Sequence, residues 1–253
     1  MGSAMVAGLL KKKVFSPEKI VVFDRDYSRR EEITHLYKIK TAANLKELVD
    51  NCNTCVLAVK PQDKEPVLNE LRAAKKKRLV ISIMAGVTIS YLEEKLGEIP
   101  VIRAMPNLGI RVDAGMTFFC PGRFVCPADV KIASMIFGCL GEISEIKEEK
   151  IDVITAISGS GPAYFFLLME MLLSYARKSG ISEEDSLKMV RQTALSASLL
   201  SREESFRELR AAVTSKGGTT EAAINVLEEY GIRKIFDSAL NAALERARRL
   251  KKI

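Results

Sequence analysis

The chain has 253 residues, of which 47% are hydrophobic and 28% charged, enough apolar material for one large domain or two modest ones. Its one histidine, His35, lies in a polar stretch that reads as a surface helix end, which argues against serine hydrolases and zinc hydrolases. The 39 basic and 32 acidic residues give a net charge of +7. The basic residues form three clusters, Lys11–Lys13, Lys75–Arg78 and Arg246–Lys252. All three lie in or just after predicted helices, where positive charge interacts favourably with the helix dipole. We therefore expect no nucleic-acid partner.

Five cysteines are present, and Cys52 and Cys55 form a C-x-x-C pair. The pair precedes the apolar run Val56–Val59, the reverse of the order in thioredoxin-like sites, and no second pair completes a zinc site. We therefore expect ordinary thiols and no metal. The first ten residues lack the charged start of a secretory signal. The apolar segment Val153–Ala176 contains glycines, a proline and Glu170, which argues against a membrane span, so a cytoplasmic protein is expected.

The first part of the chain alternates β-branched runs with helical patterns. This alternation predicts a doubly wound parallel sheet covered by helices on both faces, an α/β domain over residues 1–150. The expected strands are Lys19–Asp24, Thr54–Val59, Leu79–Met84, Pro100–Met105 and an edge strand Met116–Cys120. The expected helices are Asn44–Asn51, Lys64–Ala74, Ser90–Leu96 and Ala128–Cys139.

After Glu149 the pattern is helical throughout, which predicts an all-α domain over residues 151–253. Ser182–Asp185 resembles a capping box that starts a helix ending near Leu200, and Ile232–Leu250 has helical spacing of apolar residues. Tyr164–Tyr175 is apolar nearly all round. Such a helix must be buried on every side, which a module of this size cannot do alone, so we expect an oligomer interface.

The chain opens on small residues, Met1-Gly2-Ser3-Ala4, typical of a helix start. Gly2 fits the last glycine of a dinucleotide-binding G-x-G-x-x-G turn, and Asp24 lies 22 residues later, where the ribose-binding acid is found. A doubly wound fold usually begins with a strand before this turn. We therefore expect the native protein to begin upstream, with that strand and a Gly-x-Gly included.

Five stretches, in order, resemble the pyrroline-5-carboxylate reductase family over essentially the whole chain. They are Met1-Gly2-Ser3-Ala4-Met5, Ala58-Val59-Lys60-Pro61-Gln62, Arg103-Ala104-Met105-Pro106-Asn107, Ser158-Gly159-Ser160-Gly161-Pro162-Ala163-Tyr164 and Val213-Thr214-Ser215-Lys216-Gly217-Gly218-Thr219-Thr220. Two features depart from the family pattern: the missing strand with its Gly-x-Gly-Asn, and Lys216 where the family usually has proline.

The resemblance implies a Rossmann domain for NAD(P)H and a helical domain that interlocks two subunits, with dimers often assembling into a decamer. It implies reduction of 1-pyrroline-5-carboxylate to proline, the last step of proline biosynthesis. Asp24 favours NADH, whereas Arg25, Arg29 and Arg30 favour the 2′-phosphate of NADPH, and the family tilts the expectation to NADPH. The implied cofactor residues are Met1, Gly2, Asp24, Arg25, Asn44, Ala58, Lys60, Ala85, Asn107 and Ser160.

The second implied site is the loop before the predicted helix Glu221–Glu229. Unpaired amides at a helix N-terminus suit an anion such as the substrate's carboxylate. The local pattern alone favours a simple capped helix, and the family resemblance reverses that preference. By resemblance, Ser215 and the amides of Gly218 and Thr219, beside Gly217, would hold the carboxylate. Thr220 would hydrogen-bond the ring nitrogen.

Two other classes of function remain open from the residues. A dehydrogenase of the hydroxyacid type also pairs a Rossmann domain with helices, but it needs a catalytic lysine, and Lys178 and Lys188 lie in no recognisable motif. A non-catalytic protein that binds anions or nucleic acid would use the positive charge, which is scattered over separate helix ends.

Overall fold

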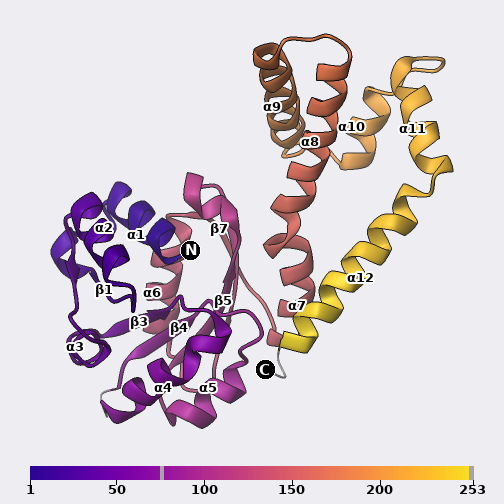
Figure 1. Cartoon of the computed structure of the whole chain (residues 1–253). Helices are drawn as coiled ribbons and strands as arrows, with labels where there is room; N and C mark the ends of the chain where they lie inside the picture. Colours follow the sequence, from indigo (N-terminus) through magenta and orange to yellow (C-terminus); the bar gives the residue numbers. More distant parts are fainter. Residues whose placement is uncertain (75–76, 251–253) are drawn as a thin grey trace. The chain divides into compact units, whose positions relative to one another are not determined.

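The structure is a computed structural model that describes residues 1–74 and 77–250. It divides into two compact units, Met1–Ser160 with Ala243–Ile253, and Gly161–Ala242 (Figure 1). Within the basic clusters, Lys75, Lys76, Lys251 and Lys252 lie outside the described residues. His35 is exposed in the last turn of a helix, as predicted.

The first unit alternates helices and strands. In chain order its elements are α1 (Gly2–Lys11), η1 (Pro17–Lys19), β1 (Val21–Val22), α2 (Tyr27–Tyr37), β2 (Lys40–Thr41), α3 (Leu45–Asn51), β3 (Thr54–Leu57), η2 (Pro61–Asp63), α4 (Lys64–Ala73), β4 (Leu79–Ser82), α5 (Ile89–Leu96), β5 (Val101–Pro106), η3 (Leu108–Val112), β6 (Gly115–Pro121), α6 (Pro127–Gly138), β7 (Gly141–Glu145), η4 (Glu148–Lys150), α7 (Ile151–Ile154) and the π-helical turn η5 (Thr155–Gly159). The predicted helices α3, α4, α5 and α6 are confirmed to within a residue or so at each end.

The strands form two sheets. The larger has the order β3-β4-β5-β6-β7, with β3, β4 and β5 parallel, β6 antiparallel to β5, and β7 parallel to β6. The smaller pairs β1 with β2 in parallel. In the doubly wound order 3-2-1-4-5-6, the strands β2, β1, β3, β4 and β5 take positions 3, 2, 4, 5 and 6, and no strand of the described chain takes position 1.

Two strand predictions need correction. The predicted buried strand Lys19–Asp24 is reduced to β1, which is only half-buried because its ladder extends over two residues of β2. The predicted edge strand Met116–Cys120 lies within β6, which is an interior strand, because the unpredicted strand β7 pairs with its outer side. Strand β7 contains two glutamates and a serine, which a search for apolar runs passes over.

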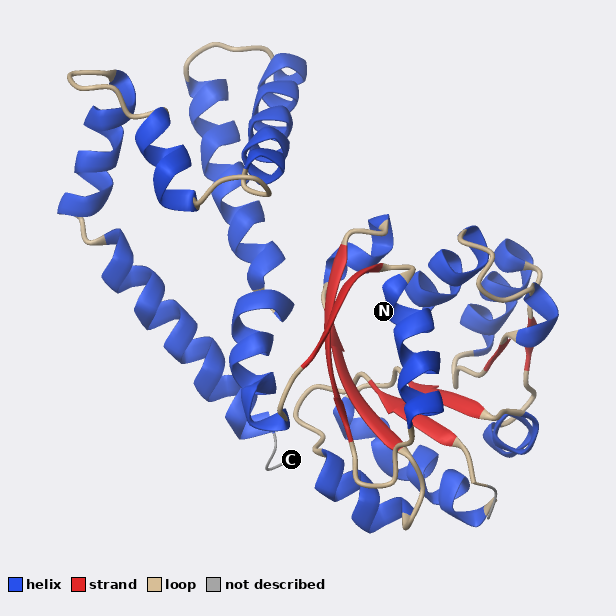
Figure 2. Cartoon of the chain, turned by 180° about the vertical axis from the view of Figure 1, so that it is seen from behind, coloured by secondary structure: helices blue, strands red, loops and turns tan. Residues whose placement is uncertain are grey.

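Helices cover both faces of the five-stranded sheet (Figure 2). Strand β4 is buried along its whole length, and its side chains alternate between two cores: Leu79 and Ile81 belong to the core with α1 and α6, whereas Val80 belongs to the core with α3, α4 and α5. Burial on both faces explains the uninterrupted apolar runs in the sequence. This packing fixes which elements end together at the carboxyl edge of the sheet.

The second unit is helical. Its elements are α8 (Gly161–Lys178), α9 (Glu183–Leu200), α10 (Phe206–Ala212), α11 (Thr219–Glu229) and α12 (Ile232–Leu250), of which the last turns, from Ala243, belong to the first unit. The predicted start of α9 is confirmed, because Ser182 Oγ accepts a hydrogen bond from the Asp185 amide at 3.1 Å. Tyr164 and Phe236 meet edge to face, with ring centroids 6.5 Å apart.

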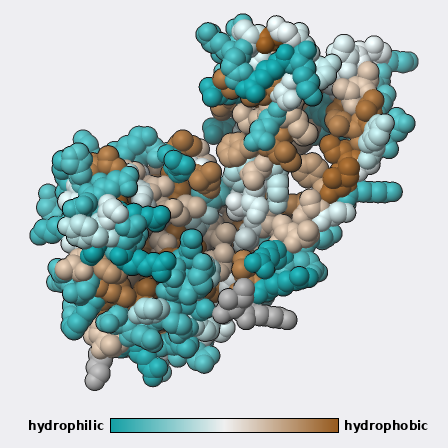
Figure 3. Space-filling model, viewed as in Figure 1, coloured by the Kyte–Doolittle hydropathy of each residue, from teal (hydrophilic) through white to brown (hydrophobic). Residues whose placement is uncertain are grey.

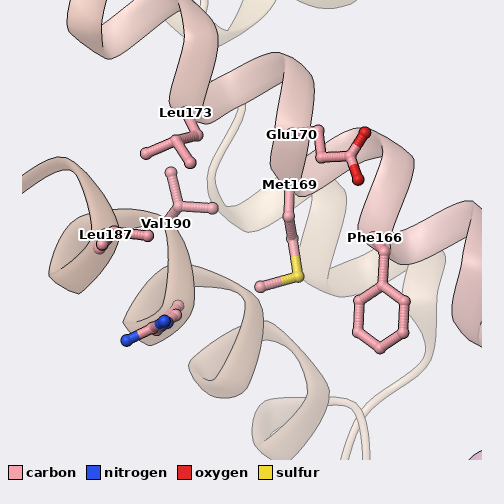
Figure 4. A pocket seen from close by; sticks show the side chains of 7 residues that line it. Phe166, Met169, Glu170, Leu173, Leu187 and Val190 are labelled. Carbon is pink, nitrogen blue, oxygen red and sulfur yellow. The ribbon is translucent and has the colours of Figure 1, made fainter. Parts of the chain in front are cut away.

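Large apolar side chains are exposed on α8 of the single chain. They include Phe165 (69% exposed), Leu168 (50%) and Tyr175 (75%), and apolar residues gather on the surface of the helical unit in Figure 3. An apolar groove of about 240 Å³ lies between α8 and α9 and is lined by Phe166, Met169, Glu170, Leu173, Leu187, Val190 and Arg191 (Figure 4). Within the described residues, one helical stretch, Glu148–Lys178, has the length and apolar composition of a membrane span, criteria that the core helix of a soluble protein also meets.

Candidate functional site

Most of the predicted cofactor residues come together where parallel strands of the first unit end. Ala58 and Lys60 follow β3, Ala85 follows β4, and Asn107 follows β5. The carboxyl ends of parallel strands are where doubly wound folds bind ligands. The other predicted residues lie on separate elements: Met1 and Gly2 are at the start of α1, Asp24 and Arg25 follow β1, Asn44 follows β2, and Ser160 follows η5.

The start of α1 is suited to a phosphate group. Met1 is the N-cap but makes no side-chain hydrogen bond, and the first turn carries no acidic residue. Amides of a first helical turn have no partner within the helix and point along the favourable end of its dipole. A Cβ added to Gly2 would lie 3.3 Å from the Cβ of Ala58, so a larger side chain would crowd the end of β3. These residues fit the pyrophosphate of a dinucleotide.

A cluster of charges follows β1, where the ribose of a dinucleotide would lie. Asp24 Oδ1 accepts from the Asp26 amide at 3.0 Å, and Arg29 approaches its other oxygen at 4.0 Å. Arg25 Nη1 lies 2.8 Å from Oδ1 of Asp63, in the turn after β3. Both arginine side chains are largely exposed. A 2′-phosphate at this position would therefore meet two exposed guanidinium groups, each already beside a carboxylate.

The guanidinium of Arg30 has a structural role. Its Nη1 donates to the carbonyl oxygens of Ala42 at 3.2 Å and Ala43 at 2.8 Å, and it lies over the rings of Phe23 and Tyr27. Arg30 therefore holds the segment after β2 in place. Among the three arginines predicted to favour a 2′-phosphate, Arg25 and Arg29 pair with carboxylates, whereas Arg30 donates to backbone carbonyl oxygens.

Three further predicted cofactor residues, Asn44, Lys60 and Ala85, follow the strands β2, β3 and β4. Asn44 Oδ1 accepts from the Glu47 amide at 2.9 Å and so caps α3. Lys60 is exposed at the start of η2. After β4, Ala85 precedes Gly86, whose φ of +78° favours glycine. A Cβ added to Gly86 would also lie 2.7 Å from the backbone of Leu250, so a side chain would collide there.

Asn107 joins three segments at the end of β5. Its Oδ1 accepts from the amides of Gly109 (3.0 Å) and Met116 (3.1 Å), and its Nδ2 donates to Ser158 Oγ at 3.4 Å. Ser158 lies in the π-helical turn η5, which ends where the Ser160 amide donates to Thr155 O at 2.9 Å. The structure thus joins Asn107 to Ser158, two residues before the predicted Ser160 and within the Ser158–Tyr164 stretch that carries the family resemblance.

A buried ion pair anchors the helical stretch that contains η5. Arg103 of β5 is 2% exposed, and its Nη1 lies 2.8 Å from Glu148 Oε1. The same carboxylate accepts from the Ile89 amide at 2.9 Å, which ties the start of α5 to the pair. Burial and the Glu148 carboxylate raise the pKa of the neighbouring Cys120 thiol to about 12. Neither Arg103 nor Glu148 was predicted as part of a site, because a lone arginine in an apolar strand gives no partner by sequence.

The predicted substrate loop lies in the second unit, at the start of α11. Gly217 has a φ of +73°, and its amide donates to Glu221 Oε2 at 2.7 Å. The Gly218 amide donates to Ser215 O at 3.0 Å, so the loop folds back on itself. Gly218 is the N-cap, and Thr219 and Thr220 are the first two residues of α11. The predicted use of the Gly218 amide for an anion thus competes with an internal bond, whereas the amides of the two threonines have no intrahelical partner.

The alternative catalytic lysines have no comparable surroundings. Lys178 ends α8, and Lys188 is exposed and lies 2.7 Å from Glu184, one turn earlier on α9. Such an exposed i,i+4 pair is ordinary surface chemistry. The described residues contain no cluster of three or more histidine, cysteine or acidic side chains able to hold a metal ion.

Comparison with known proteins matches both parts of the chain. Residues 1–86 match the family model for coenzyme F420-dependent NADP oxidoreductases, and residues 148–250 match the model for pyrroline-5-carboxylate reductase dimerisation. The chain is 36% identical to the pyrroline-5-carboxylate reductase of Mycobacterium tuberculosis, with 99% of this chain and 94% of the relative aligned. It is 35% identical to the enzyme of Synechocystis, with 100% and 95% aligned.

Solved structures agree with this match. A pyrroline-5-carboxylate reductase from Coxiella burnetii is 36% identical, with a TM-score of 0.89, and the two chains are covered to 100% and 95%. A Plasmodium falciparum pyrroline carboxylate reductase with NADP bound is 30% identical, with a TM-score of 0.91 and coverage of 99% and 94%. A prephenate dehydrogenase from Aquifex aeolicus, at 15% identity and a TM-score of 0.55, shares the fold alone.

The fold and the edge of its sheet define an NADP-dependent oxidoreductase: a Rossmann-like domain followed by a helical dimerisation domain. Within that class, the identity to relatives over the whole chain decides the family. The chain belongs to the pyrroline-5-carboxylate reductases.

Proposed function

We propose that this protein reduces 1-pyrroline-5-carboxylate to L-proline with NADPH as the preferred hydride donor and NADH as the second. The observation that carries the proposal is the full-length match to pyrroline-5-carboxylate reductases, which includes both the sheet edge and the glycine-rich loop before α11. The similar structure from Plasmodium falciparum has NADP bound, which supports the choice of cofactor. This reaction is the last step of proline biosynthesis.

The division of labour follows the two parts of the chain. We assign cofactor binding to residues 1–150 and substrate binding and subunit association to residues 151–253. On the cofactor side, Met1, Gly2 and Ala58 receive the pyrophosphate, and Asp24, Arg25, Asn44 and Lys60 surround the adenosine ribose. Ala85, Asn107 and Ser160 lie toward the nicotinamide. Arg25 and Arg29 are the side chains that can turn toward a 2′-phosphate, which supports NADPH.

Imine reduction requires little acid–base chemistry from the protein's side chains. When bound, a nicotinamide cofactor would supply the hydride for the imine carbon, and the ring nitrogen would take up a proton. The protein's contribution is to orient the substrate and to favour the protonated, iminium-like form. A chain whose single histidine lies on an exposed helix can therefore carry out this reaction.

The loop before α11 supplies that orientation. The amides of Thr219 and Thr220 point from the first turn of α11 toward the substrate's carboxylate, and Ser215 completes the site. Gly217 and Gly218 give the loop its shape: one has a positive φ, and a Cβ on the other would lie 2.5 Å from Ser215 Oγ. Thr220 Oγ1 hydrogen-bonds the ring nitrogen.

We also propose that the dimer formed through the helical domain assembles further, to a decamer. The exposed apolar residues of α8 and the groove between α8 and α9 support burial by other copies of the chain. The five cysteines all lie within the described residues and form no disulfide with one another, which suits the reducing cytoplasm.

The test is NADPH oxidation with pyrroline-5-carboxylate, and separately with a panel of 2-hydroxy acids and NADP⁺. The proposal requires proline as product and no turnover of the hydroxy acids. Turnover of a hydroxy acid alone would instead identify a dehydrogenase of that type. Binding of nucleic acid that persists at raised salt, without NADPH oxidation, would identify a non-catalytic protein.

A further inference from the structure

One face of β5 is joined along its length to the helical stretch that follows β7. Side chains alternate along a strand, so Arg103, Met105 and Asn107 share a face. Arg103 reaches Glu148 at 2.8 Å, the Met105 side chain lies beside Gly159, 2.9 Å from the position of an added Cβ, and Asn107 Nδ2 reaches Ser158 Oγ at 3.4 Å. An ion pair, an apolar contact and an amide thus tie strand and helix together.

The spacing of the two polar contacts, Arg103 with Glu148 and Asn107 with Ser158, is consistent in both elements. From Arg103 to Asn107 the strand rises about 13 Å, at about 3.3 Å per residue. From Glu148 to Ser158 the helix rises about 15 Å, at 1.5 Å per residue. Strand and helix therefore run side by side in the same direction with matched ends. Contacts with β5 therefore fix the position of Ser158.

The π-helical turn frees the Ser158 hydroxyl from its own helix. A serine or threonine inside a helix commonly donates to the carbonyl four residues earlier, as Thr155 Oγ1 does to Ile151 O at 2.7 Å. Ser158 makes no such bond to a described residue and meets Asn107 instead. Single π-turns within α-helices are frequent at functional sites, and this one lies next to the end of β5.

The hydrogen bonds around Asn107 fix the direction of the Ser158 proton. Because Asn107 Oδ1 accepts from two backbone amides, its Nδ2 must face Ser158, and an amide nitrogen can only donate. Ser158 Oγ is therefore the acceptor in this pair. Its own proton remains for an acceptor, and no described residue provides one at this half-buried position.

The position of this proton identifies the acceptor. Strand β5 takes the last position of the doubly wound order, in the half of the sheet that binds the second nucleotide of a dinucleotide. We propose that Ser158 donates a hydrogen bond to the carboxamide oxygen of the nicotinamide, and that Asn107 is the positioning residue that aims it. The inference rests on the cofactor of the proposed function and explains how the ring is held in one orientation.

The test measures cofactor binding without the pyrroline substrate. Ser158→Ala should weaken NADPH binding about three- to tenfold, the effect of one lost hydrogen bond. The same variant should bind 2′,5′-ADP, which lacks the nicotinamide, as tightly as the wild type. Ser144→Ala on the edge strand β7 is the matched control and should change neither affinity.

A second variant tests the direction of the proton. Asn107→Asp keeps an acceptor for the two backbone amides but replaces the donor facing Ser158 with another acceptor. The serine proton should then turn to the new carboxylate, so NADPH binding should weaken as in Ser158→Ala while 2′,5′-ADP binding persists. The double variant should be no weaker than Ser158→Ala. Melting temperatures close to wild type exclude a general loss of structure.

The inference is overturned by NADPH binding within twofold of wild type in Ser158→Ala, by equal weakening of NADPH and 2′,5′-ADP, or by additive losses in the double variant. A reduced 3-acetylpyridine cofactor, which keeps the carbonyl oxygen but lacks the amide NH₂, should show the same loss on Ser158→Ala. An unchanged affinity for this analogue in Ser158→Ala counts against donation to the oxygen. A chain that passes these tests but does not reduce pyrroline-5-carboxylate would contradict the proposed function alone.

Discussion

Thr220 offers a clean separation of stability from catalysis. The N-cap of α11 is Gly218, and Thr220 is the second residue of the helix. No hydrogen bond joins its hydroxyl to another described residue, so Thr220→Ala removes no capping bond. Threonine and alanine differ in helix propensity by less than about 0.7 kcal/mol, in favour of alanine. We therefore expect the free energy of unfolding of Thr220→Ala to equal that of the wild type or slightly exceed it.

The effect on activity should be much larger. A hydrogen bond to a charged group contributes about 1.5–3 kcal/mol. If that bond forms to the iminium-like nitrogen, its loss should lower kcat/KM on the order of ten- to a hundredfold. Thr220→Ser keeps the hydroxyl and should retain most of the activity. Neither variant should change the affinity for NADPH, since the residue lies on the substrate side.

The assay is steady-state NADPH oxidation with pyrroline-5-carboxylate, accompanied by urea unfolding of each variant. Thr219→Ala, which changes the neighbouring residue of the same turn but leaves its amide, is the matched control and should reduce activity far less. An alanine variant at position 220 within twofold of the wild-type kcat/KM would refute the role of the hydroxyl. A loss of activity that follows a loss of stability would refute the structural part of the reasoning.

Three further predictions concern the buried pair, the interface and the thiols. Glu148→Ala should cost about 3 kcal/mol in urea unfolding, because it leaves the buried guanidinium of Arg103 without its carboxylate. Leu168→Lys should abolish the dimer in light scattering, giving monomer or aggregate, because a charge would be placed in an apolar interface. At pH 8, iodoacetamide should label the exposed Cys126 but spare Cys120, whose pKa of about 12 keeps it a thiol; since the folded pKa is raised, labelling of folded protein should begin only as the pH approaches that value.

Each of these predictions has a contrary result, and the first and third have a control. Glu149→Ala changes the neighbouring exposed carboxylate and should leave stability unchanged; equal stability of both variants would show that the buried pair contributes nothing. A stable dimer of Leu168→Lys would place the interface on another face of α8. Rapid labelling of Cys120 in folded protein near neutral pH would contradict its burial, and labelling of denatured protein at both cysteines is the control.

Several features followed from the sequence without tertiary information. Helical periodicity gave α9 and α12 because repeated apolar spacing over many residues leaves few alternatives. Runs of β-branched and other apolar residues predicted β3, β4 and β5, because strands buried on both faces have uninterrupted apolar sequences. The five family motifs gave the family, since their order and spacing are specific. The polar strand β7 was missed because nothing in its composition marks a strand before its pairing with β6 is known.

The contacts that orient the site are a matter of tertiary structure. Asn107 and Ser158 are 51 residues apart, and Arg103 and Glu148 are 45 apart, so no local pattern relates them. Their pairing depends on the register of β5 against the helical stretch and on a π-turn that shifts the face of one serine. Likewise, the local sequence pattern indicated a capped helix after this loop, whereas only the structure identifies Gly218 as the N-cap. Sequence periodicity determines which residues form helices and strands; the direction of each hydrogen bond in the site depends on which elements the packed sheet places next to each other.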